Sequence, residues 1–495
     1  MSCQVAVLGG GLAGMATAAR LQAASLSTAV IEAHGHVGGC AGYYRQRGFS
    51  FDVGATTMVD FEQGGVGAEL LDSVGMDPVP GEPLPGYVAW LPDRDVTLYR
   101  DTRAWHRERL RALGDTPRHR AFWARLDRIA QVFWDASRAG VRLPLRRPSD
   151  AVHNIKALGP RNLPLVRYVN ATLGDVLARH GLRGDAPLVG LLSMLVEDTV
   201  HSTVDKAPLI NAALGVTIRG AGLTRAVGGM RGFWRPFTAH YRRMGGQLRV
   251  GCQAERVHGQ AGAFEVHTRR GIVHAEQVVS ALPAATTASV VPALAGRLRP
   301  YLERDEHDLG GAIVVFLGVP EEQVANQEFT HHQLLQSYGR PLGDGNNMFV
   351  SVSAPGDTES APPGHRAVMI STHTELHAWE GLPDAQYEKR KREMGERLVG
   401  LARRAYPDLG ERAVVWEVGT PRSYERFAFR PRGAVGGARQ TPANANQNAI
   451  PHSLGVPGLW LVGDSTWPGL GTVACALGSR IVAEDVLETA RKVMR

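Results

Sequence analysis

The chain has 495 residues, which is too long for one ordinary core at about 150 residues per domain. Hydrophobic residues make up 44% and charged residues 21%, which excludes a disordered protein, and the net charge of +7 permits an anionic partner without identifying one. The 58 glycines follow no three-residue period, so collagen is excluded and each glycine is interpreted by its position.

Neither disulfide bonds nor a membrane span is expected. The four cysteines, Cys3, Cys40, Cys252 and Cys475, lie far apart without a C-x-x-C pair, which argues against a disulfide framework or zinc knuckle and favours a reducing compartment. The N-terminal apolar run has no basic segment before it, so no secretory signal is expected. The longest apolar stretch, 186–196, is well short of the roughly 20 residues of a spanning helix.

The first elements predict a β-α-β unit. Residues 5–8 are a short run rich in β-forming residues, directly followed by glycines, and residues 12–24 have the apolar spacing of a helix. Residues 28–31 have the composition of a second buried strand, which ends at Glu32. Strand, glycine turn, helix and strand together predict a parallel sheet.

A G-x-G-x-x-G motif occupies the turn of this unit. Gly9 permits the tight turn, Gly11 lets the backbone approach a pyrophosphate, and Gly14 lets the helix pack on the strand. The N-terminus of the helix offers free N–H groups to the phosphate charge. Glu32, at about the expected distance, can accept hydrogen bonds from both ribose hydroxyls. The motif alone is weak, but its position between strand and helix predicts dinucleotide binding rather than a simple turn.

A second segment near the C-terminus favours FAD over NAD. Residues 459–462 predict a strand followed by Gly463 and Asp464, and a helix is expected from about Thr472 to Lys492. An acid at this turn can hold a ribityl hydroxyl, and the helix N-terminus can face the flavin pyrimidine edge. The alternative for Asp464 is an ordinary capping or turn residue.

The middle of the chain differs from both ends. Prolines cluster over 78–85, and an arginine-rich, helical stretch follows over 94–147. Strands are expected at 247–250, 264–266, 277–280, 312–317, 347–352, 368–372 and 413–418. The last four have the spacing of an antiparallel sheet in a second domain.

Several motifs together resemble a known family. The segments 5–39, 48–54, 228–230, 420–427 and 463–469 are similar to those of the flavoprotein superfamily of amine oxidases and phytoene desaturases. Within it they resemble FAD-dependent carotenoid desaturases and carotene isomerases, especially the bacterial 3,4-desaturases. The resemblance is densest over 1–60, 220–285 and 415–490.

This resemblance implies an α/β fold, with a Rossmann-type FAD-binding domain and an inserted α+β substrate domain. The expected FAD-binding domain is discontinuous, over 1–75, 220–300 and 420–495, and the substrate-binding, membrane-contacting domain covers 76–219 and 301–419. The cofactor-binding residues expected from motifs and resemblance together are Gly9, Gly11, Leu12, Ala13, Gly14, Glu32, Gly38, Gly39, Arg45, Val257 (by its backbone), Gly463, Asp464, Gly471, Thr472 and Val473.

The chain departs from its relatives near the expected flavin face. Where they often have His-Pro-Gly-Glu-Gly, this sequence has Trp467 and Leu470 in place of the two polar residues. Either the pocket admits a more apolar end of the substrate, or the two side chains only repack. They are the substrate-facing candidates; no catalytic residue is identified, because the flavin itself accepts the hydride equivalent.

Two sequence features are candidates for a metal site or for thiol chemistry. His331 and His332 lack further ligands nearby in sequence, so we interpret them as a loop and expect no metal site. Cys40 can lie near the flavin, but without a second nearby cysteine it is interpreted as a small core thiol.

The arginine-rich stretch has acids interspersed, which is typical of a solvated helix face and argues against nucleic acid. Our functional interpretation is contact with anionic lipid headgroups, because a carotenoid must be drawn from a bilayer. Apolar segments at 163–169 and 187–196 either line the access route or belong to the core. The expected location is cytoplasmic and peripheral, on the inner face of the cell membrane.

The sequence thus predicts an FAD-dependent oxidoreductase that introduces C=C bonds into a long isoprenoid polyene, with an electron acceptor that it does not identify. One alternative is a carotene cis–trans isomerase that uses reduced FAD. A flavin amine oxidase and a non-enzymatic isoprenoid-binding protein on the same fold are further alternatives.

Overall fold

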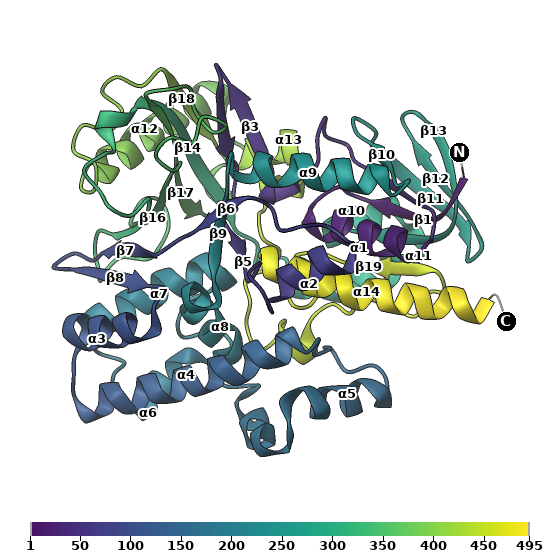
Figure 1. Cartoon of the computed structure of the whole chain (residues 1–495), viewed down its shortest axis with the longest axis horizontal. Coiled ribbons are helices and arrows are strands. Elements are labelled where there is room, and N and C mark those ends of the chain that lie inside the picture. Colours follow the sequence, from purple (N-terminus) through teal and green to yellow (C-terminus); the bar gives the residue numbers. More distant parts are fainter. Residues whose placement is uncertain (1, 494–495) are drawn as a thin grey trace.

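A largely parallel sheet forms the half of the molecule that holds both chain ends (Figure 1). The computed structural model describes residues 2–493, with side chains to Arg491. The parallel strands are β10 (Gln247–Arg249), β2 (Thr28–Ile31), β1 (Ser2–Leu8), β13 (Gly271–Ser280) and β19 (Leu459–Leu461). The antiparallel strands β12 (Ala263–Thr268) and β11 (Ala254–Gln260) extend the sheet beyond the first half of β13.

Helices cover both faces of this sheet, which is why its central strands are apolar without alternation. On β1, Val5 and Val7 face a core shared with the first group of helices, whereas Ala6 and Leu8 face the core of the second. The first group comprises α1 (Leu12–Ala23), α2 (Val66–Ser73), α9 (Gly229–Arg243) and α14 (Thr472–Val493). The second comprises α10 (Ala284–Val290) and α11 (Pro292–Asp305).

A second sheet of seven strands lies in the other half of the molecule (Figure 1). In spatial order it contains β18 (Val415–Gly419), β14 (Gly311–Pro320), β17 (His365–Thr374), β16 (Asn347–Val352), β15 (His331–Leu335), β7 (Gly86–Trp90) and β8 (Asp95–Tyr99). Only the β15–β7 pair is parallel. Helix α12 (Asp384–Ala402) covers one face with Met394, Leu398 and Val399. Part of the opposite face packs against Phe49 and Phe51, and part lines a cavity.

A helical layer packs beneath β7 and β8 (Figure 1). It consists of α3 (Thr102–Leu113), α4 (Pro117–Arg138), α5 (Pro148–Leu158), the 3-10 segment η2 (Pro160–Tyr168), α6 (Leu173–Arg179), α7 (Ala186–Val200) and α8 (Leu209–Ala221). Short elements join the halves: β3 (Tyr43–Gln46), β4 (Phe49–Asp52), β5 (Met58–Val59), β6 (Gly81–Pro83), β9 (Leu223–Ala226) and α13 (Pro421–Ala428). No described helix is long and apolar enough to cross a membrane.

The structure corrects the interpretation of His331 and His332 as a loop. Both lie in β15 and are fully buried. Trp90 donates to His332 Nδ1 at 3.2 Å, so His332 Nε2 donates to the Tyr406 hydroxyl at 2.8 Å. These partners lie far away in the sequence, so residue spacing gives no sign that the pair belongs to a buried strand. The described residues contain no cluster of three or more metal-ligating side chains.

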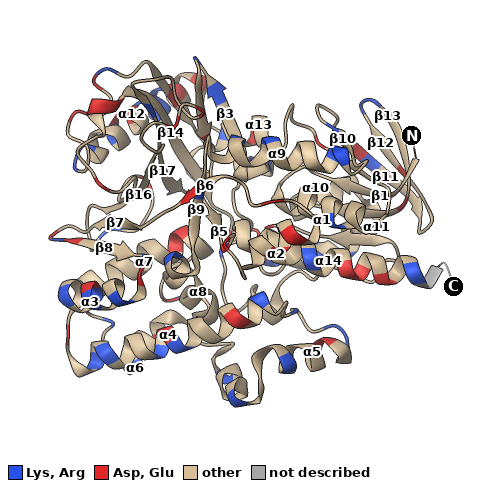
Figure 2. Cartoon of the chain, viewed as in Figure 1, with Lys and Arg blue, Asp and Glu red and all other residues tan. Residues whose placement is uncertain are grey.

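The arginine-rich stretch forms α3 and α4, and much of its charge is paired. Arg109 binds Asp127 at 2.6 Å, and Arg120 binds Asp115 at 2.5 Å. Figure 2 shows blue and red residues interspersed along these helices. Arg120 lies on an exposed helix face, whereas Arg109 is buried against Trp123, so only part of this stretch is a solvated helix face.

Candidate functional site

One cavity of about 1690 Å³ connects the two halves of the molecule. One wall is formed where the parallel strands of the first sheet end, at Gly9 after β1, Glu32 after β2, Ala281 after β13 and Gly463 after β19. The remainder includes part of one face of the second sheet, helices α4, α5, α7 and α8, and the 3-10 segment η2. Ligands of open α/β folds bind at this carboxyl end of the strands.

The glycine turn after β1 is shaped for close approach of a ligand. Gly9 has φ +96°, a conformation that strains other residues. A Cβ at Gly14 would lie 2.1 Å from the Gly9 carbonyl oxygen, so only glycine lets α1 pack here. A Cβ at Gly11 would meet no protein atom within 4 Å, although Gly11 lines the cavity. The backbone at Gly11 is therefore bare on the side where a pyrophosphate is expected.

The Glu32 carboxylate lies at the end of β2 and is held by backbone amides. The N–H of Gly10 donates to Oε2 and the N–H of His34 donates to Oε1, both at 2.6 Å. Burial raises the pKa of Glu32, and these two hydrogen bonds oppose the rise. Each oxygen keeps a second lone pair, so the carboxylate can still accept from ribose hydroxyls on the cavity side.

Asp464 has a partner that the sequence analysis did not identify. Arg430 donates to Asp464 Oδ2 at 2.9 Å, and this arginine also contacts the Cys40 thiol. Burial alone would lower the pKa of Arg430, but Asp464 outweighs it and the guanidinium stays charged. Cys40 lines the cavity and is half-buried, and it also packs against the core that contains Phe51 and Phe316. Burial raises its pKa, which keeps the thiol protonated.

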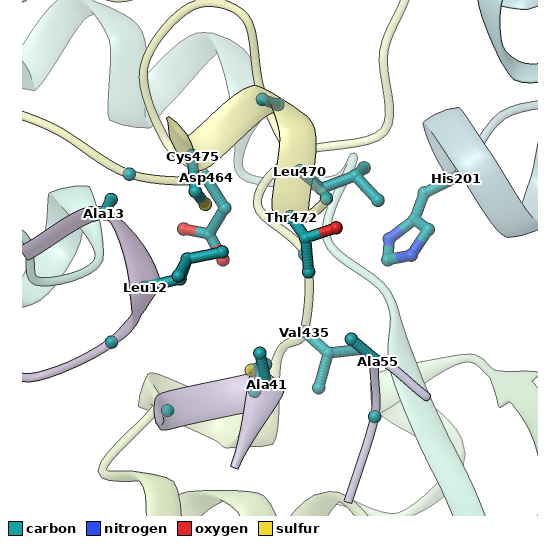
Figure 3. A pocket seen from close by; sticks show the side chains of 18 of the residues that line it. Leu12, Ala13, Ala41, Ala55, His201, Val435, Asp464, Leu470, Thr472 and Cys475 are labelled. Carbon is teal, nitrogen blue, oxygen red and sulfur yellow. The ribbon is translucent and has the colours of Figure 1, made fainter. Parts of the chain in front are cut away.

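The close-up of this region shows how the two cofactor segments face each other (Figure 3). Leu12 and Ala13 lie opposite Asp464 and Cys475 across one end of the cavity, and Ala41 lies below them. Thr472, at the start of α14, points into the middle of the space, and its hydroxyl accepts from the Val59 N–H at 3.0 Å.

Nearly all the expected cofactor-binding residues line the cavity. The residues that do so are Gly9, Gly11, Leu12, Ala13, Gly14, Glu32, Gly38, Gly39, Arg45, Gly463, Asp464, Gly471, Thr472 and Val473. Val257 does not: its side chain is buried in the core between the first sheet and α11. The chain reaches the cavity instead at Gln253 and Ala254, just before and at the start of β11.

The two substrate-facing candidates are placed differently. Trp467 is 6% exposed and belongs to the core around α1 and α14, although part of it reaches the cavity wall. Leu470 points into the space between Thr472 and His201 (Figure 3). Trp467 therefore mainly packs, whereas Leu470 makes the wall beside the cofactor segments more apolar.

The cavity wall away from the glycine turn is assembled from residues that the sequence analysis missed. They come from strands of the second sheet and from helices, and no local motif connects them. They include Tyr87, Val314, Phe316, Gln333, Asn347, Phe349, Ser371 and His373 on the sheet, and Glu197, Asp198, His201, Asn211 and Arg219 on or just after α7 and α8.

Three of these residues form a chain of polar side chains. Glu197 Oε2 lies 3.4 Å from His373 Nδ1, and the rings of His373 and His201 are 4.6 Å apart in an edge-to-face arrangement. Burial opposes protonation of His373, but Glu197 outweighs it and raises its pKa. Burial and the nearby His373 hold the pKa of His201 well below its usual value. His201 is therefore a neutral imidazole that faces the centre of the cavity (Figure 3).

The residues present fit an FAD. Gly11 offers backbone free of side-chain obstruction, Glu32 offers a carboxylate for the ribose, and Asp464 offers one for the ribityl chain. The N-termini of α1 and α14 both open onto the cavity and present N–H groups. The volume exceeds the roughly 300–1,000 Å³ of common small-molecule sites, so a second ligand has room beside the cofactor.

Comparison with known proteins agrees with this description. The model of the family "Flavin containing amine oxidoreductase" matches residues 12–487. The chain is 24% identical to a chloroplastic prolycopene isomerase of Arabidopsis thaliana, over 99% of this chain and 84% of the relative. It is 20% identical to a 4,4'-diapophytoene desaturase of Staphylococcus aureus, over 98% of this chain and 99% of the relative.

A solved structure has the same fold. The cyclohexylamine oxidase of Brevibacterium oxydans superposes with a TM-score of 0.63 at 15% identity, with all of both chains covered. The predicted fold class, a Rossmann-type FAD-binding fold with an inserted α+β region, is confirmed.

Proposed function

The chain belongs to the family of flavin containing amine oxidoreductases, and we propose that it is a carotenoid desaturase, to which its similarity to a 4,4'-diapophytoene desaturase gives support. Its cofactor is FAD, as the sequence predicts. In the proposed reaction, two hydrogen atoms leave adjacent carbons of a long isoprenoid polyene and a C=C bond forms. FAD, when bound, supplies the two-electron acceptor for such a reaction.

The observation that carries this proposal is the reach of the cavity. It extends from the glycine turn at Gly9 to Leu145, Ile155, Leu163 and Val166, which are 37% to 49% exposed at the surface. Its lining is mainly apolar, as a polyene requires. The chain's own side chains orient the polyene beside the flavin and exclude water.

The domain division also remains our proposal. We propose that 1–75, 220–300 and 420–495 form the FAD-binding domain, and that 76–219 and 301–419 form the substrate-binding domain. The first sheet takes its strands from the first of these sets and the second sheet from the other.

An exposed apolar surface supports contact with a membrane. We call the side chains of Leu145, Val152, Ile155, Leu163 and Val166, on and beside α5 and η2, the apolar rim; all are exposed and all but Val152 also line the cavity. Exposed basic residues lie among them: Arg146, Arg147, Lys156, Arg161 and Arg167. In Figure 2 this segment lies at one edge of the molecule, with more blue than red. The combination fits an anionic bilayer surface from which a polyene passes into the cavity.

Sedimentation with vesicles tests this contact. The double variant Ile155→Ser and Val166→Ser should bind phosphatidylglycerol vesicles at least about tenfold more weakly than the wild type, because apolar area is lost from the rim. Val227→Ser with Val414→Ser is the matched control, since both valines are similarly exposed but do not line the cavity. Equal binding by the rim variant and the control would exclude the rim as the membrane contact.

A second candidate function is carotene cis–trans isomerisation with reduced FAD. It is favoured by the 24% identity to the prolycopene isomerase of Arabidopsis thaliana over nearly the whole chain. Expression in a host that makes acyclic carotenoids distinguishes the two, because desaturation lengthens the conjugated system and shifts the pigment absorption to the red. Isomerisation keeps the double-bond count, so chromatography would separate isomers of unchanged mass.

The remaining alternatives predict other outcomes of simple assays. A flavin amine oxidase would release hydrogen peroxide with amines and leave the pigments unchanged. A non-enzymatic isoprenoid-binding protein would leave the pigments unchanged as well and would turn over neither substrate. Either result would contradict the proposed desaturase.

A further inference from the structure

His201 is a strained residue whose side chain meets the cavity. It follows the last turn of α7 with φ +52° and ψ +34°, a left-handed conformation that suits glycine and strains other residues. Its side chain is only partly buried, lines the cavity and points into the space beside Leu470 (Figure 3). Strain of this kind clusters at functional sites, which makes the imidazole a candidate for a role in the reaction.

The segment after α13 packs closely against this ring. Gly436 has φ +73°, and a Cβ added there would lie 2.1 Å from His201 Cε1, so only glycine leaves room for the imidazole. A Cβ at the next residue, Gly437, would lie 2.4 Å from the carbonyl oxygen of Asp464. One short segment thus contacts both His201 and a residue expected at the ribityl chain. The imidazole therefore borders the cofactor end of the cavity.

The partners of the ring fix its orientation and leave one nitrogen free. The ring donates a hydrogen bond to the backbone of Val435, so in the neutral imidazole the other nitrogen keeps its lone pair. Behind the ring, His373 lies edge-to-face at 4.6 Å between ring centroids and is itself held by Glu197. His201 is thus supported from α7, from β17 and from the segment after α13.

The surroundings of His201 keep its imidazole unprotonated. Burial lowers the pKa of His201 well below 6.5, and the nearby His373, Arg439 and Arg430 lower it further through their positive charge. Glu197 is the carboxylate behind His373, whose pKa it raises. Because its cationic neighbours disfavour a further charge, His201 stays neutral at physiological pH and has a lone pair available.

Loss of two hydrogen atoms from a polyene requires an acceptor for one proton. In the proposed desaturation, one hydrogen passes to FAD with the electron pair of its C–H bond. The hydrogen on the adjacent carbon leaves as a proton, and the electron pair of its C–H bond becomes the second bond of the new C=C. A hydrocarbon has no group of its own that can take up this proton.

We propose that His201 accepts this proton on its free ring nitrogen and is a catalytic residue of the reaction. The proton remains on the imidazole until the product leaves, and then passes to water. This inference rests on the proposed function, because it assumes that a polyene loses hydrogen in the cavity. It adds a chemical role for a side chain to the orienting role of the apolar wall.

Anaerobic mixing of the FAD-loaded protein with an acyclic polyene tests the proposal. His201→Gly removes the imidazole without straining the backbone, because glycine adopts this conformation readily. Flavin reduction by the polyene should be at least about 100-fold slower in the variant, since a general base contributes about 100- to 10,000-fold. Added imidazole should restore at least about tenfold of the lost rate. Polyene affinity, measured by quenching of tryptophan fluorescence, should stay within about twofold of the wild type.

The pH dependence gives a second readout. In the wild type, the rate of flavin reduction should be constant above pH 6.5 and fall only in more acidic solution, because protonation of His201 removes the acceptor. His240→Gly is the matched control, since His240 is also partly buried, in the last turn of α9, but does not line the cavity. This control should reduce its flavin at the wild-type rate, with no effect of imidazole.

Two results would overturn the role of His201 alone. One is flavin reduction in His201→Gly within about threefold of the wild type. The other is a slower rate matched by an equal loss of polyene affinity, which would mean that His201 only shapes the cavity. Wild-type flavin that stays oxidised with the polyene would instead overturn the proposed function, and the role of His201 along with it.

Discussion

The two ends of the cavity are built in different ways. The cofactor end is formed by backbone: Gly9, Gly11 and Gly14 form one continuous turn, and the position of each follows from a φ angle or a Cβ distance. The substrate end is formed by side chains such as Tyr87, Arg219 and Gln333, which come from distant parts of the chain. Backbone requirements leave a local sequence motif, whereas a wall of side chains from many elements does not.

The largest expected effect concerns the glycine turn. Gly14→Ala places a Cβ about where the Gly9 oxygen lies, 2.1 Å away, so α1 must move. Such overpacking costs about 1–3 kcal/mol or more, and we expect a lower melting temperature and no bound FAD. Gly11→Ala meets no protein atom, so it should lose FAD while the apoprotein melts like the wild type. Flavin absorbance of the purified protein and thermal unfolding measure both. If the Gly14→Ala and Gly11→Ala apoproteins melted at the same temperature, the different roles assigned to these two glycines would be contradicted.

The next largest expected effect is a pH-dependent change in folding stability caused by His332 in the second sheet. Burial lowers the pKa of His332 to about 4, whereas the unfolded chain has the ordinary value near 6.5. Because the folded pKa is depressed, the neutral imidazole favours folding above pH 6.5. This stability is lost as the pH falls from about 6.5 to 4, by roughly 3 kcal/mol.

His332→Gln should remove that loss. The variant is less stable than the wild type at neutral pH, because its packing against Trp90 and Tyr406 is disturbed. The difference should shrink steadily between pH 6.5 and 4 in urea unfolding curves. A difference independent of pH would mean that His332 is not held neutral in the folded protein.

A smaller effect is expected from Glu32→Ala. This change removes the carboxylate expected at the ribose and leaves the N–H groups of Gly10 and His34 without their acceptor. Hydrogen bonds to charged groups contribute about 1.5–3 kcal/mol, so FAD should bind about 10- to 100-fold more weakly. Glu255→Ala, at a half-exposed ion pair with Arg269 away from the cavity, should bind FAD normally. Undiminished FAD affinity in Glu32→Ala would remove Glu32 from the cofactor site.

The smallest expected effect is on polyene binding by Leu470, which lies at the boundary between the two ends of the cavity. Leu470→Ala removes an apolar side chain that is only partly buried, which costs about 1 kcal/mol of contact with a polyene. We expect a KM for the polyene about fivefold higher with unchanged FAD retention. A loss of FAD without a change in KM would place Leu470 against the cofactor instead.

Local signals predicted the first half of the molecule well. The strands expected at 28–31 and 277–280 end where the sequence places them, and the helix after the glycine turn begins at Leu12. The strands β7 and β8 were missed within the proline- and arginine-rich region, and β15 was interpreted as a loop. In β15 the two histidines break the apolar pattern of a buried strand. His332 is buried against Trp90 and Tyr406, and His331 stacks on Tyr87, all far away in the sequence.

The same contrast holds for individual site residues. Asp464 was found through a motif, but its partner Arg430 was not, although it follows the quoted segment 420–427 by three residues. The link between Glu197, His373 and His201 joins α7 to β17 and cannot be recognised from spacing. Such pairs are set by tertiary packing, which a single sequence does not display.

One anaerobic measurement tests the central claim most directly. The purified protein with oxidised FAD is mixed with an acyclic polyene, and the products are identified by chromatography and mass. We predict about one equivalent of a polyene with one additional C=C bond for each flavin, with the flavin reduced in the same amount. An unchanged polyene together with oxidised flavin, or isomerisation seen only after the flavin has been reduced beforehand, would contradict the desaturase.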